Sequence, residues 1–138
     1  MDKFVRVGIA VLVKRGDKYL LLKRTASLGN NTWCPPGGKV EFSEDLEVAV
    51  MREFKEEVGN DIIITKPEFV CITNDYFEKE QQHYITIHTT AEYVSGEADI
   101  NEPTKFSDIG WFSLQEMNTM DLFLPMLNLK INNTYSYK

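Results

Sequence analysis

Short runs of apolar, often β-branched residues recur along the chain and predict strands. Residues 4–14 and 19–24 form two such runs, and the turn-forming Gly16 and Asp17 between them predict a hairpin. Further strands are expected at residues 62–65, 69–73, 83–94 and 109–112. Side chains in 83–94 alternate between apolar and polar, which is typical of a long strand with one buried face. The polar residues 74–82 are expected to form a hairpin loop.

A helical pattern follows Ser43, whose hydroxyl is expected to cap a helix that Gly59 ends. At 100° per residue, one arc of this helix carries Val50, Met51, Phe54 and Val58. The opposite arc carries Arg52, Glu53, Glu56 and Glu57. One face is therefore expected to pack against the rest of the protein, while the other collects carboxylates.

Two helical segments are expected near the carboxyl end of the chain. Ser113 and Glu116 have the spacing of a capping box for a helix that begins at Leu114. Residues 121–129 form a further apolar segment that is expected to be helical, to cover the sheet and to end at residues 132–133.

The carboxylates on the first helix need a positive partner. Glutamates at positions i, i+3 and i+4 repel one another, and Arg52 neutralises only part of their charge. Oxygen ligands in this number suit a hard divalent cation such as Mg²⁺. An ordinary solvated acidic face is the alternative for such a helix taken by itself. The flanking residues decide between the two.

These flanking residues complete a longer motif. Gly38 is followed after five residues by Glu44, and after seven more by the run Arg52-Glu53-Phe54-Lys55-Glu56-Glu57-Val58-Gly59. This order resembles the Nudix box, the signature of hydrolases that act on nucleoside diphosphates linked to another group. Two positions depart from it: Phe54 stands where an aliphatic residue is usual, and Asn60 stands where a hydrophobic one is usual.

The resemblance covers nearly the whole chain and implies an α+β architecture, the Nudix fold, as a single domain over residues 1–138. In this fold a mixed, mainly β central sheet lies between helices as an α/β/α sandwich. The box helix is expected on one side of the sheet and the carboxy-terminal helix on the other.

The resemblance also implies a site for Mg²⁺, with Mn²⁺ able to replace it. The expected ligands are the carboxylates of Glu53, Glu56 and Glu57, a backbone carbonyl of Gly37 or Gly38, and Glu102 from a later acidic loop. Glu53 is expected to be the general base, with Glu102 as its rival. Arg52 is expected to orient Glu53 or Glu56. Glu44 is expected to support the metal ligands from the loop side.

Substrate contacts are expected from four residues: Arg24, Lys39, Tyr84 and Thr86. Arg24 and Lys39 are candidates for binding phosphate, each weighed against an ordinary surface position. The pattern around Tyr84 and Thr86, taken with residues 101–103 and 111–112, is similar to a subgroup of Nudix enzymes. That subgroup hydrolyses nucleoside triphosphates, including oxidised or modified purine forms.

The nucleobase pocket is expected where residues 28–33, 84–86 and 122–127 meet, and the pattern of residues does not give its shape. Within the last of these segments, Phe123 and Leu127 are expected mainly to pack in the core, with contact to a nucleobase as the alternative.

Three functions fit these features. The first is a nucleoside triphosphate pyrophosphohydrolase, which releases a monophosphate and pyrophosphate and is favoured by the compact chain. The second is a hydrolase of ADP-ribose, nucleotide sugars or dinucleoside polyphosphates, enzymes that commonly carry extra segments. The third is a nucleotide-sensing module without catalysis, which usually loses box carboxylates, whereas none is missing here.

Composition and charge narrow the partners and the compartment. With 43% hydrophobic residues, 26% charged residues and a net charge of -6, the chain is typical of globular proteins and unlike those that bind a nucleic-acid polymer. Cys34 and Cys71 are too few for a disulfide scaffold, so reduced thiols and a cytoplasmic location are expected. No signal sequence and no membrane span are expected. A homodimer is compatible with the fold.

Overall fold

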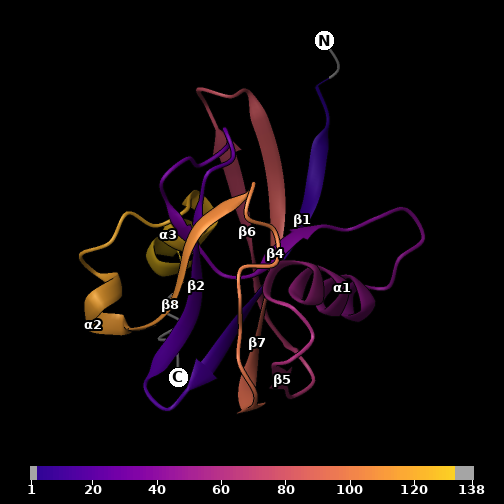
Figure 1. Ribbon diagram of the computed structural model, residues 1–138. Coiled ribbons are helices and arrows are strands. Elements are labelled where there is room, and N and C mark those ends of the chain that lie inside the picture. Colours follow the sequence, from indigo (N-terminus) through magenta and orange to yellow (C-terminus); the bar gives the residue numbers. More distant parts are fainter. Residues whose placement is uncertain (1–2, 133–138) are drawn as a thin grey trace.

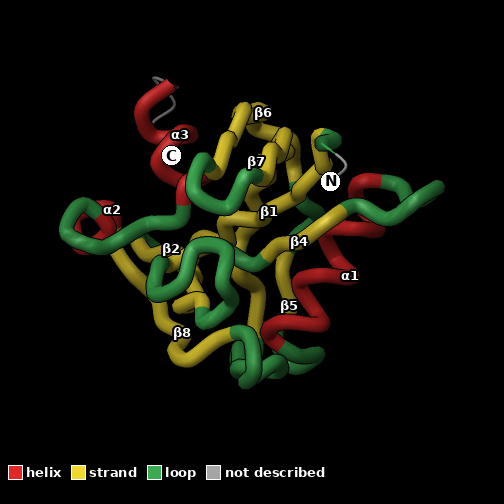
Figure 2. Tube along the Cα trace, turned by 90° about the horizontal axis from the view of Figure 1, so that it is seen from above, coloured by secondary structure: helices red, strands yellow, loops and turns green. Residues whose placement is uncertain are grey.

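The computed structural model describes residues 3–132 and places a central sheet between helices (Figure 1). The strands are β1 (Val5–Arg15), β2 (Lys18–Arg24), β3 (Trp33–Cys34), β4 (Gly37–Lys39), β5 (Ile63–Ile64), β6 (Glu68–Phe77), β7 (Gln82–Ser95) and β8 (Phe106–Ser113). The helices are α1 (Leu46–Val58), α2 (Leu114–Met117) and α3 (Leu124–Asn132). Seen from above, α1 and α3 lie on opposite sides of the strands, which confirms the expected α+β sandwich (Figure 2).

The sheet is mixed because β1 runs parallel to β7 and antiparallel to β2 and β4. The parallel pairing is long and extends from Val5–His83 to Lys14–Glu92. β1 and β2 pair only beside their hairpin turn. Beyond that point β4 pairs with residues 8–10 of β1, whereas β2 pairs with β3 and β8. β1 and β2 therefore diverge, and the cavity described below is lined by residues of both strands.

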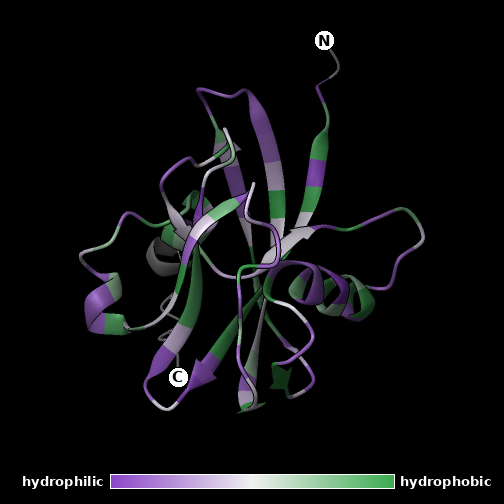
Figure 3. Cartoon of the chain, viewed as in Figure 1, coloured by the Kyte–Doolittle hydropathy of each residue, from purple (hydrophilic) through white to green (hydrophobic). Residues whose placement is uncertain are grey.

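Each face of the sheet has its own apolar cluster, because alternate residues of a strand point to opposite faces. The cluster under α1 contains Ile9, Val11, Val13, Val50, Phe54 and Val58. The cluster under α2 and α3 contains Leu12, Tyr19, Leu21, Met117, Met126 and Leu129. Hydrophobic segments follow the central strands, while α1 shows both hydrophobic and hydrophilic residues (Figure 3). Both faces of β1 are thus buried from Gly8 to Val13.

The expected cap at Ser43 is wrong. Ser43 lies in the loop before the helix with φ +64, and α1 begins at Leu46 with Asp45 in the N-cap position. The side chain of Asp45 makes no capping hydrogen bond. Gly59 ends the helix as expected, with φ +89, a conformation that only glycine adopts without strain.

The expected loop at residues 74–82 is also wrong over most of its length. β6 continues to Phe77 and β7 begins at Gln82, so only residues 78–81 form the turn. The polar side chain of Asp75 suggested a solvent-exposed loop, yet it points inward from β6 and is fully buried.

β7 is covered on both faces, whereas one exposed face was expected. Thr86 and His88 are buried on the face that was predicted to be polar and solvated. β8 begins at Phe106, three residues before the predicted strand.

The carboxy-terminal helices follow the expected order. Ser113 and Glu116 form the predicted capping box at the start of α2. α3 begins at Leu124, three residues after the predicted start, and includes Asn132, the first of the two residues where a stop was expected; Asn133 lies outside the described residues. Within residues 3–132 no helix has the length and apolar character needed to cross a membrane.

Candidate active site

Helix α1 places its carboxylates beside β4. Val50, Phe54 and Val58 are buried against the sheet, which fixes the rotation of the helix about its axis. Because residues three and four apart lie on one side of a helix, Glu53 and Glu57 are then directed to the same place. Glu57 is only 6% exposed, although its residue type suggested a solvated position.

Arg52 connects the acidic residues at this face. Its Nε and Nη2 donate to the two carboxylate oxygens of Glu44 at 2.6 and 2.9 Å, a bidentate pair. Its Nη1 donates to Oε1 of Glu53 at 2.8 Å, and Nη2 also donates to the carbonyl of Lys39 at 3.0 Å. The nearest oxygen of Glu56 is 3.4 Å away. Of the two expected targets, Arg52 therefore holds Glu53 more closely than Glu56.

The hydrogen bonds of Arg52 set the charge state of this face. They hold the pKa of Glu44 down at about 2, with a smaller contribution from the backbone N–H of Glu41. The pKa of Glu53 is instead raised, because burial of its carboxylate outweighs the attraction of Arg52. Glu44 is thus a permanent anion that anchors Arg52, while Glu53 is a more basic carboxylate.

Glu57 is held by the backbone of β4. Oε1 of Glu57 accepts a hydrogen bond from the N–H of Gly37 at 2.9 Å. Burial raises the pKa of Glu57 to about 8, and repulsion from Glu53 and Glu102 adds to the effect, while the Gly37 hydrogen bond opposes it. The three carboxylates therefore lack enough positive charge around them.

Gly38 allows the helix to approach β4 closely. A Cβ atom at this position would lie 2.3 to 2.6 Å from the carboxylate atoms of Glu53. A Cβ at Gly37 would lie 2.1 Å from the carbonyl oxygen of Ile9. Both glycines are therefore required for Glu53 and Glu57 to sit directly above the backbone of β4.

Glu102 joins the group from the loop before β8. Asn101 ties this loop to α1, since its Nδ2 donates to the carbonyl of Glu56 at 3.0 Å and its N–H donates to the carbonyl of Glu57 at 2.9 Å. Oε2 of Glu102 lies 3.2 Å from Nζ of Lys105, a lysine that was not among the expected site residues. Lys105 has a raised pKa, chiefly because of this hydrogen bond.

These residues fit a divalent cation. Oε1 of Glu102 is the one buried side-chain polar atom without a hydrogen-bond partner in the described part of the chain. Together with the raised pKa of Glu57, it indicates that this group of carboxylates needs a further positive charge. In residues 3–132 no three acidic, histidine or cysteine side chains are already arranged as a metal-binding group. The carboxylates would therefore adjust when an ion binds. Glu56 is the most exposed of the expected ligands and does not line the cavity.

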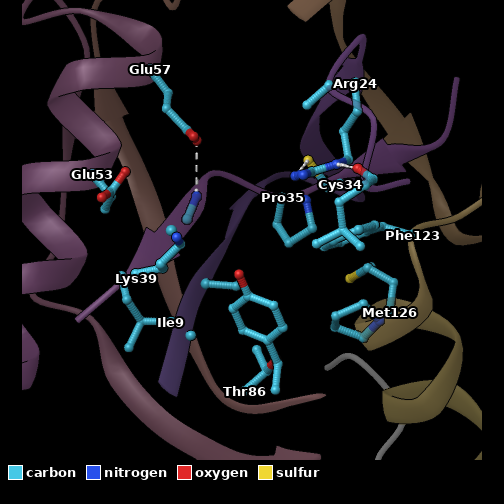
Figure 4. A pocket seen from close by; sticks show the side chains of 18 of the residues that line it. Ile9, Arg24, Cys34, Pro35, Lys39, Glu53, Glu57, Thr86, Phe123 and Met126 are labelled. Carbon is cyan, nitrogen blue, oxygen red and sulfur yellow. Dashed lines mark hydrogen bonds between the residues drawn. The ribbon is translucent and has the colours of Figure 1, made fainter. Parts of the chain in front are cut away.

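A cavity of about 480 Å³ extends from these carboxylates across the sheet. Figure 4 shows Glu53 and Glu57 on one side of it and Arg24, Phe123 and Met126 on the other. The Nε of Arg24 donates to the carbonyl of Leu28 at 2.9 Å, and the guanidinium lies 4.0 Å from the centroid of the Phe123 ring. Arg24 is therefore held within the wall of the cavity.

The other expected substrate contacts also line the cavity: Lys39, Tyr84 and Thr86. The residue Lys39 is exposed at the rim. Burial raises the pKa of Tyr84, so its hydroxyl stays protonated at neutral pH. The hydroxyl of Thr86 donates to Oδ2 of Asp75 at 2.6 Å, so its proton is already used within the protein.

The end of the cavity away from the carboxylates is aromatic and was not predicted in this form. The rings of Phe77 and Phe123 lie 5.3 Å apart between their centroids, tilted by 35°. Phe123 lines the cavity and also packs partly against the core cluster under α1, so contact with a nucleobase stays a prediction. His88 also lines the cavity, and no spacing rule in the sequence could have identified it.

Comparisons with known proteins agree with this geometry. A family model described as NUDIX domain matches residues 3–130. The nucleoside triphosphatase NudI of Enterobacter sp. (strain 638) is 27% identical over 124 residues, which are 85% of this chain and 88% of that protein. NudI of Klebsiella pneumoniae subsp. pneumoniae is 29% identical with the same coverage. The crystal structure of a MutT NUDIX hydrolase from Burkholderia pseudomallei has a TM-score of 0.82 and 29% identity, covering 92% of this chain and 97% of that one.

Proposed function

The chain belongs to the NUDIX domain family, and on this basis we propose that it hydrolyses nucleoside triphosphates to a monophosphate and pyrophosphate. The relatives named nucleoside triphosphatase support this choice, because they match over most of their own length. The observation that carries it is a single cavity with buried carboxylates at one end and aromatic rings at the other. Such a cavity suits a ligand with a charged phosphate chain and a flat base.

The cation is proposed to be Mg²⁺, with Mn²⁺ able to replace it. Glu53 and Glu57, which line the cavity, would hold it together with a carbonyl of Gly37 or Gly38. Glu102, through its unpartnered oxygen, and Glu56 would contribute from outside the cavity lining. The bound ion would neutralise charge on the phosphate oxygens and on the departing pyrophosphate.

Arg52 and Glu53 prepare the attack of water on phosphorus. Arg52, itself anchored by Glu44, holds one oxygen of Glu53 and leaves the other able to accept a proton from the attacking water. The raised pKa of Glu53 supports its role as the general base. Glu102 remains its rival, because its buried oxygen is likewise unoccupied by a donor among residues 3–132.

Cations and aromatic rings would then hold the substrate. Lys39 and Lys105 lie near the carboxylate end, where they can contact phosphate oxygens. Arg24 lies over Phe123, so it can contact a phosphate while it keeps this ring in place. Phe77 and Phe123 offer their faces to a base.

The proposal is tested with a panel of nucleoside triphosphates and Mg²⁺, with pyrophosphate and orthophosphate measured separately. We expect pyrophosphate and a monophosphate in equal amounts. Glu57→Gln should lose most of this turnover while it remains folded, since an amide oxygen can still accept the Gly37 hydrogen bond. Glu47→Gln is the matched control, because Glu47 is exposed on the same helix and pairs only with Lys66 among the described residues, at 3.5 Å.

The same assay separates the other functions. ADP-ribose, nucleotide sugars and dinucleoside polyphosphates would yield products without pyrophosphate. Turnover of those compounds alone would replace the proposed substrate class. Binding of nucleotides without any turnover would indicate a sensing module. Cys34 and Cys71 form no disulfide in the described part of the chain, which agrees with the proposed cytoplasmic location; fractionation of cells would test that location.

A further inference from the structure

A buried polar network lies on the side of the cavity away from the carboxylates. We call it the Asp75 network; it consists of Thr73 and Asp75 of β6, Thr86 and His88 of β7, and Asn128 of α3. Asp75 is fully buried and His88 is 2% exposed. Thr86 and His88 also line the cavity. Their register partners on the neighbouring strand β1 are the small residues Gly8 and Ala10. The network therefore touches the space where a base is expected.

The carboxylate of Asp75 accepts three hydrogen bonds. Nδ2 of Asn128 donates to Oδ1 at 2.8 Å. The hydroxyls of Thr73 and Thr86 donate to Oδ2 at 3.0 and 2.6 Å. Both oxygens of Asp75 act as acceptors, so both threonine protons are directed to Asp75.

This arrangement fixes which nitrogen of His88 carries the proton. Oγ1 of Thr73 lies 2.8 Å from Nε2 of His88. Because the one hydroxyl proton of Thr73 is already directed to Asp75, its oxygen can only accept from His88. Nε2 must therefore carry the hydrogen.

The other ring nitrogen is then a hydrogen-bond acceptor. Burial lowers the pKa of His88 to about 4 and outweighs the attraction of Asp75, so the ring is neutral at pH 7. A neutral imidazole with hydrogen on Nε2 has a lone pair on Nδ1. Among the side chains described for residues 3–129, the hydrogen bond of His88 is the one from Nε2 to Thr73, and none donates to Nδ1.

We propose that the Asp75 network holds His88 as a hydrogen-bond acceptor that selects nucleobases bearing an exocyclic amino group. This inference rests on the proposed function only in that a base occupies the aromatic end of the cavity. His88 would contact the base directly, and Asp75 and Thr73 would be positioning residues that act through His88. The alternative is that the network only fastens α3 to the sheet through Asn128.

The substitution Asp75→Asn separates these two roles. The amide oxygen of the new side chain would stay opposite Nδ2 of Asn128, so its NH₂ group would face the two threonine oxygens. Thr73 would then accept from this NH₂ group and donate its own proton to Nε2 of His88. The ring hydrogen would move to Nδ1, and the acceptor would become a donor. All hydrogen bonds of the network would be kept, so α3 would stay in place.

The first experiment is ¹⁵N NMR of the histidine rings, which distinguishes the two neutral forms without any catalysis. We expect hydrogen on Nε2 of His88 in the wild type and in Thr73→Ser, and on Nδ1 in Asp75→Asn. The same spectra are recorded during titration with three pairs of monophosphates: AMP with purine riboside monophosphate, GMP with IMP, and CMP with UMP. In at least one pair the amino member should bind about tenfold more tightly to the wild type and perturb Nδ1.

The preference should disappear or reverse in Asp75→Asn, and it should disappear in His88→Phe, which keeps a ring but no acceptor. Thr90→Val is the matched control, since Thr90 lies on the same face of β7 and donates instead to the carbonyl of Leu12 at 3.2 Å. Hydrogen on Nδ1 in the wild type would overturn the proposal. So would an amino preference that survives both substitutions, or the absence of any preference in the wild type.

A failure of this proposal can be distinguished from a failure of the proposed function. If the wild type hydrolyses no triphosphate yet AMP, GMP or CMP perturbs Nδ1 of His88 as described, the proposed reaction fails and the base contact stands. If triphosphates are hydrolysed and the substitutions leave the choice of base unchanged, the base contact fails and the reaction stands.

Discussion

The carboxylate end of the cavity takes Glu53 and Glu57 from one helix, whereas the aromatic end takes its side chains from β6, β7, α3 and the residue before α3. Glu53 and Glu57 are four positions apart on α1, so the helix alone sets their relation. Asp75 and Asn128 are 53 positions apart and meet only when α3 packs on the sheet. Substitutions at the first end should therefore change chemistry with little effect on the fold, and substitutions at the second should also change selectivity and stability.

The largest effect should come from Glu53→Gln. The amide keeps the shape of the side chain but can neither accept a proton nor repel Glu57, so we expect kcat/KM to fall by about 10³-fold with unchanged Tm. Steady-state kinetics and thermal unfolding measure the two quantities, with Glu47→Gln as control. A fall in Tm together with activity would show that this end also depends on packing.

Gly38→Ala tests whether the close approach of β4 matters for Glu53. The new Cβ would lie 2.3 Å from the Glu53 carboxyl carbon, so this flexible side chain must move while the backbone need not. We expect activity to fall by about 10²-fold, as for other small displacements of a reacting group. Circular dichroism and Tm should match the wild type. Full activity would mean that the position of Glu53 is not critical.

At the aromatic end, the pH dependence of stability should report His88. Its pKa is lowered to about 4, so the folded protein binds fewer protons than the unfolded chain between pH 4 and about 6.5. The contribution of His88 to stability is therefore fully present above pH 6.5 and is lost as the pH falls toward 4. Between pH 7 and pH 5 this loss should amount to about 2 kcal/mol.

Between pH 7 and pH 5, the free energy of unfolding of His88→Phe should fall by about 2 kcal/mol less than that of the wild type. Urea denaturation at each pH measures this free energy. Thr90→Val should keep the pH dependence of the wild type. Equal pH dependence in all three proteins would contradict a neutral, buried His88.

The smallest effect is expected at the border between the two ends. Arg24→Ala should raise KM by about tenfold and change kcat less, because it removes a phosphate contact and loosens Phe123. Lys23→Ala, the next residue on β2, is the matched control. An unchanged KM for Arg24→Ala would mean that Arg24 serves only its contacts within the protein, which are to Leu28, Cys34 and Phe123.

The contrast between the ends also explains what the sequence could predict. The arc of Glu53, Glu56 and Glu57 follows from helical periodicity, and the paired glycines mark the close approach of β4. The burial of Glu57 depends on how closely α1 packs against β4 at Gly37, and helical periodicity does not specify this distance. The capping box at Ser113 could be predicted because its contacts join residues only three positions apart in the sequence.

The aromatic end could not be predicted in the same way. Asp75 misled the assignment of β6, because a polar residue is usually placed in a loop or on a surface. It is buried because three donors from three different elements converge on it. Phe123 contacts both the core and the cavity, so a choice between the two roles was too narrow.

The parallel pairing of β1 with β7 has a consequence for the order of folding. Ala10 and Thr89, which hydrogen-bond across this pairing, are 79 positions apart. During synthesis the edge of β1 that pairs with β7 stays unpaired until most of the chain has left the ribosome. Contacts between such distant residues form slowly, so early trapping of the exposed edge by another chain is the main hazard on the way to the native state.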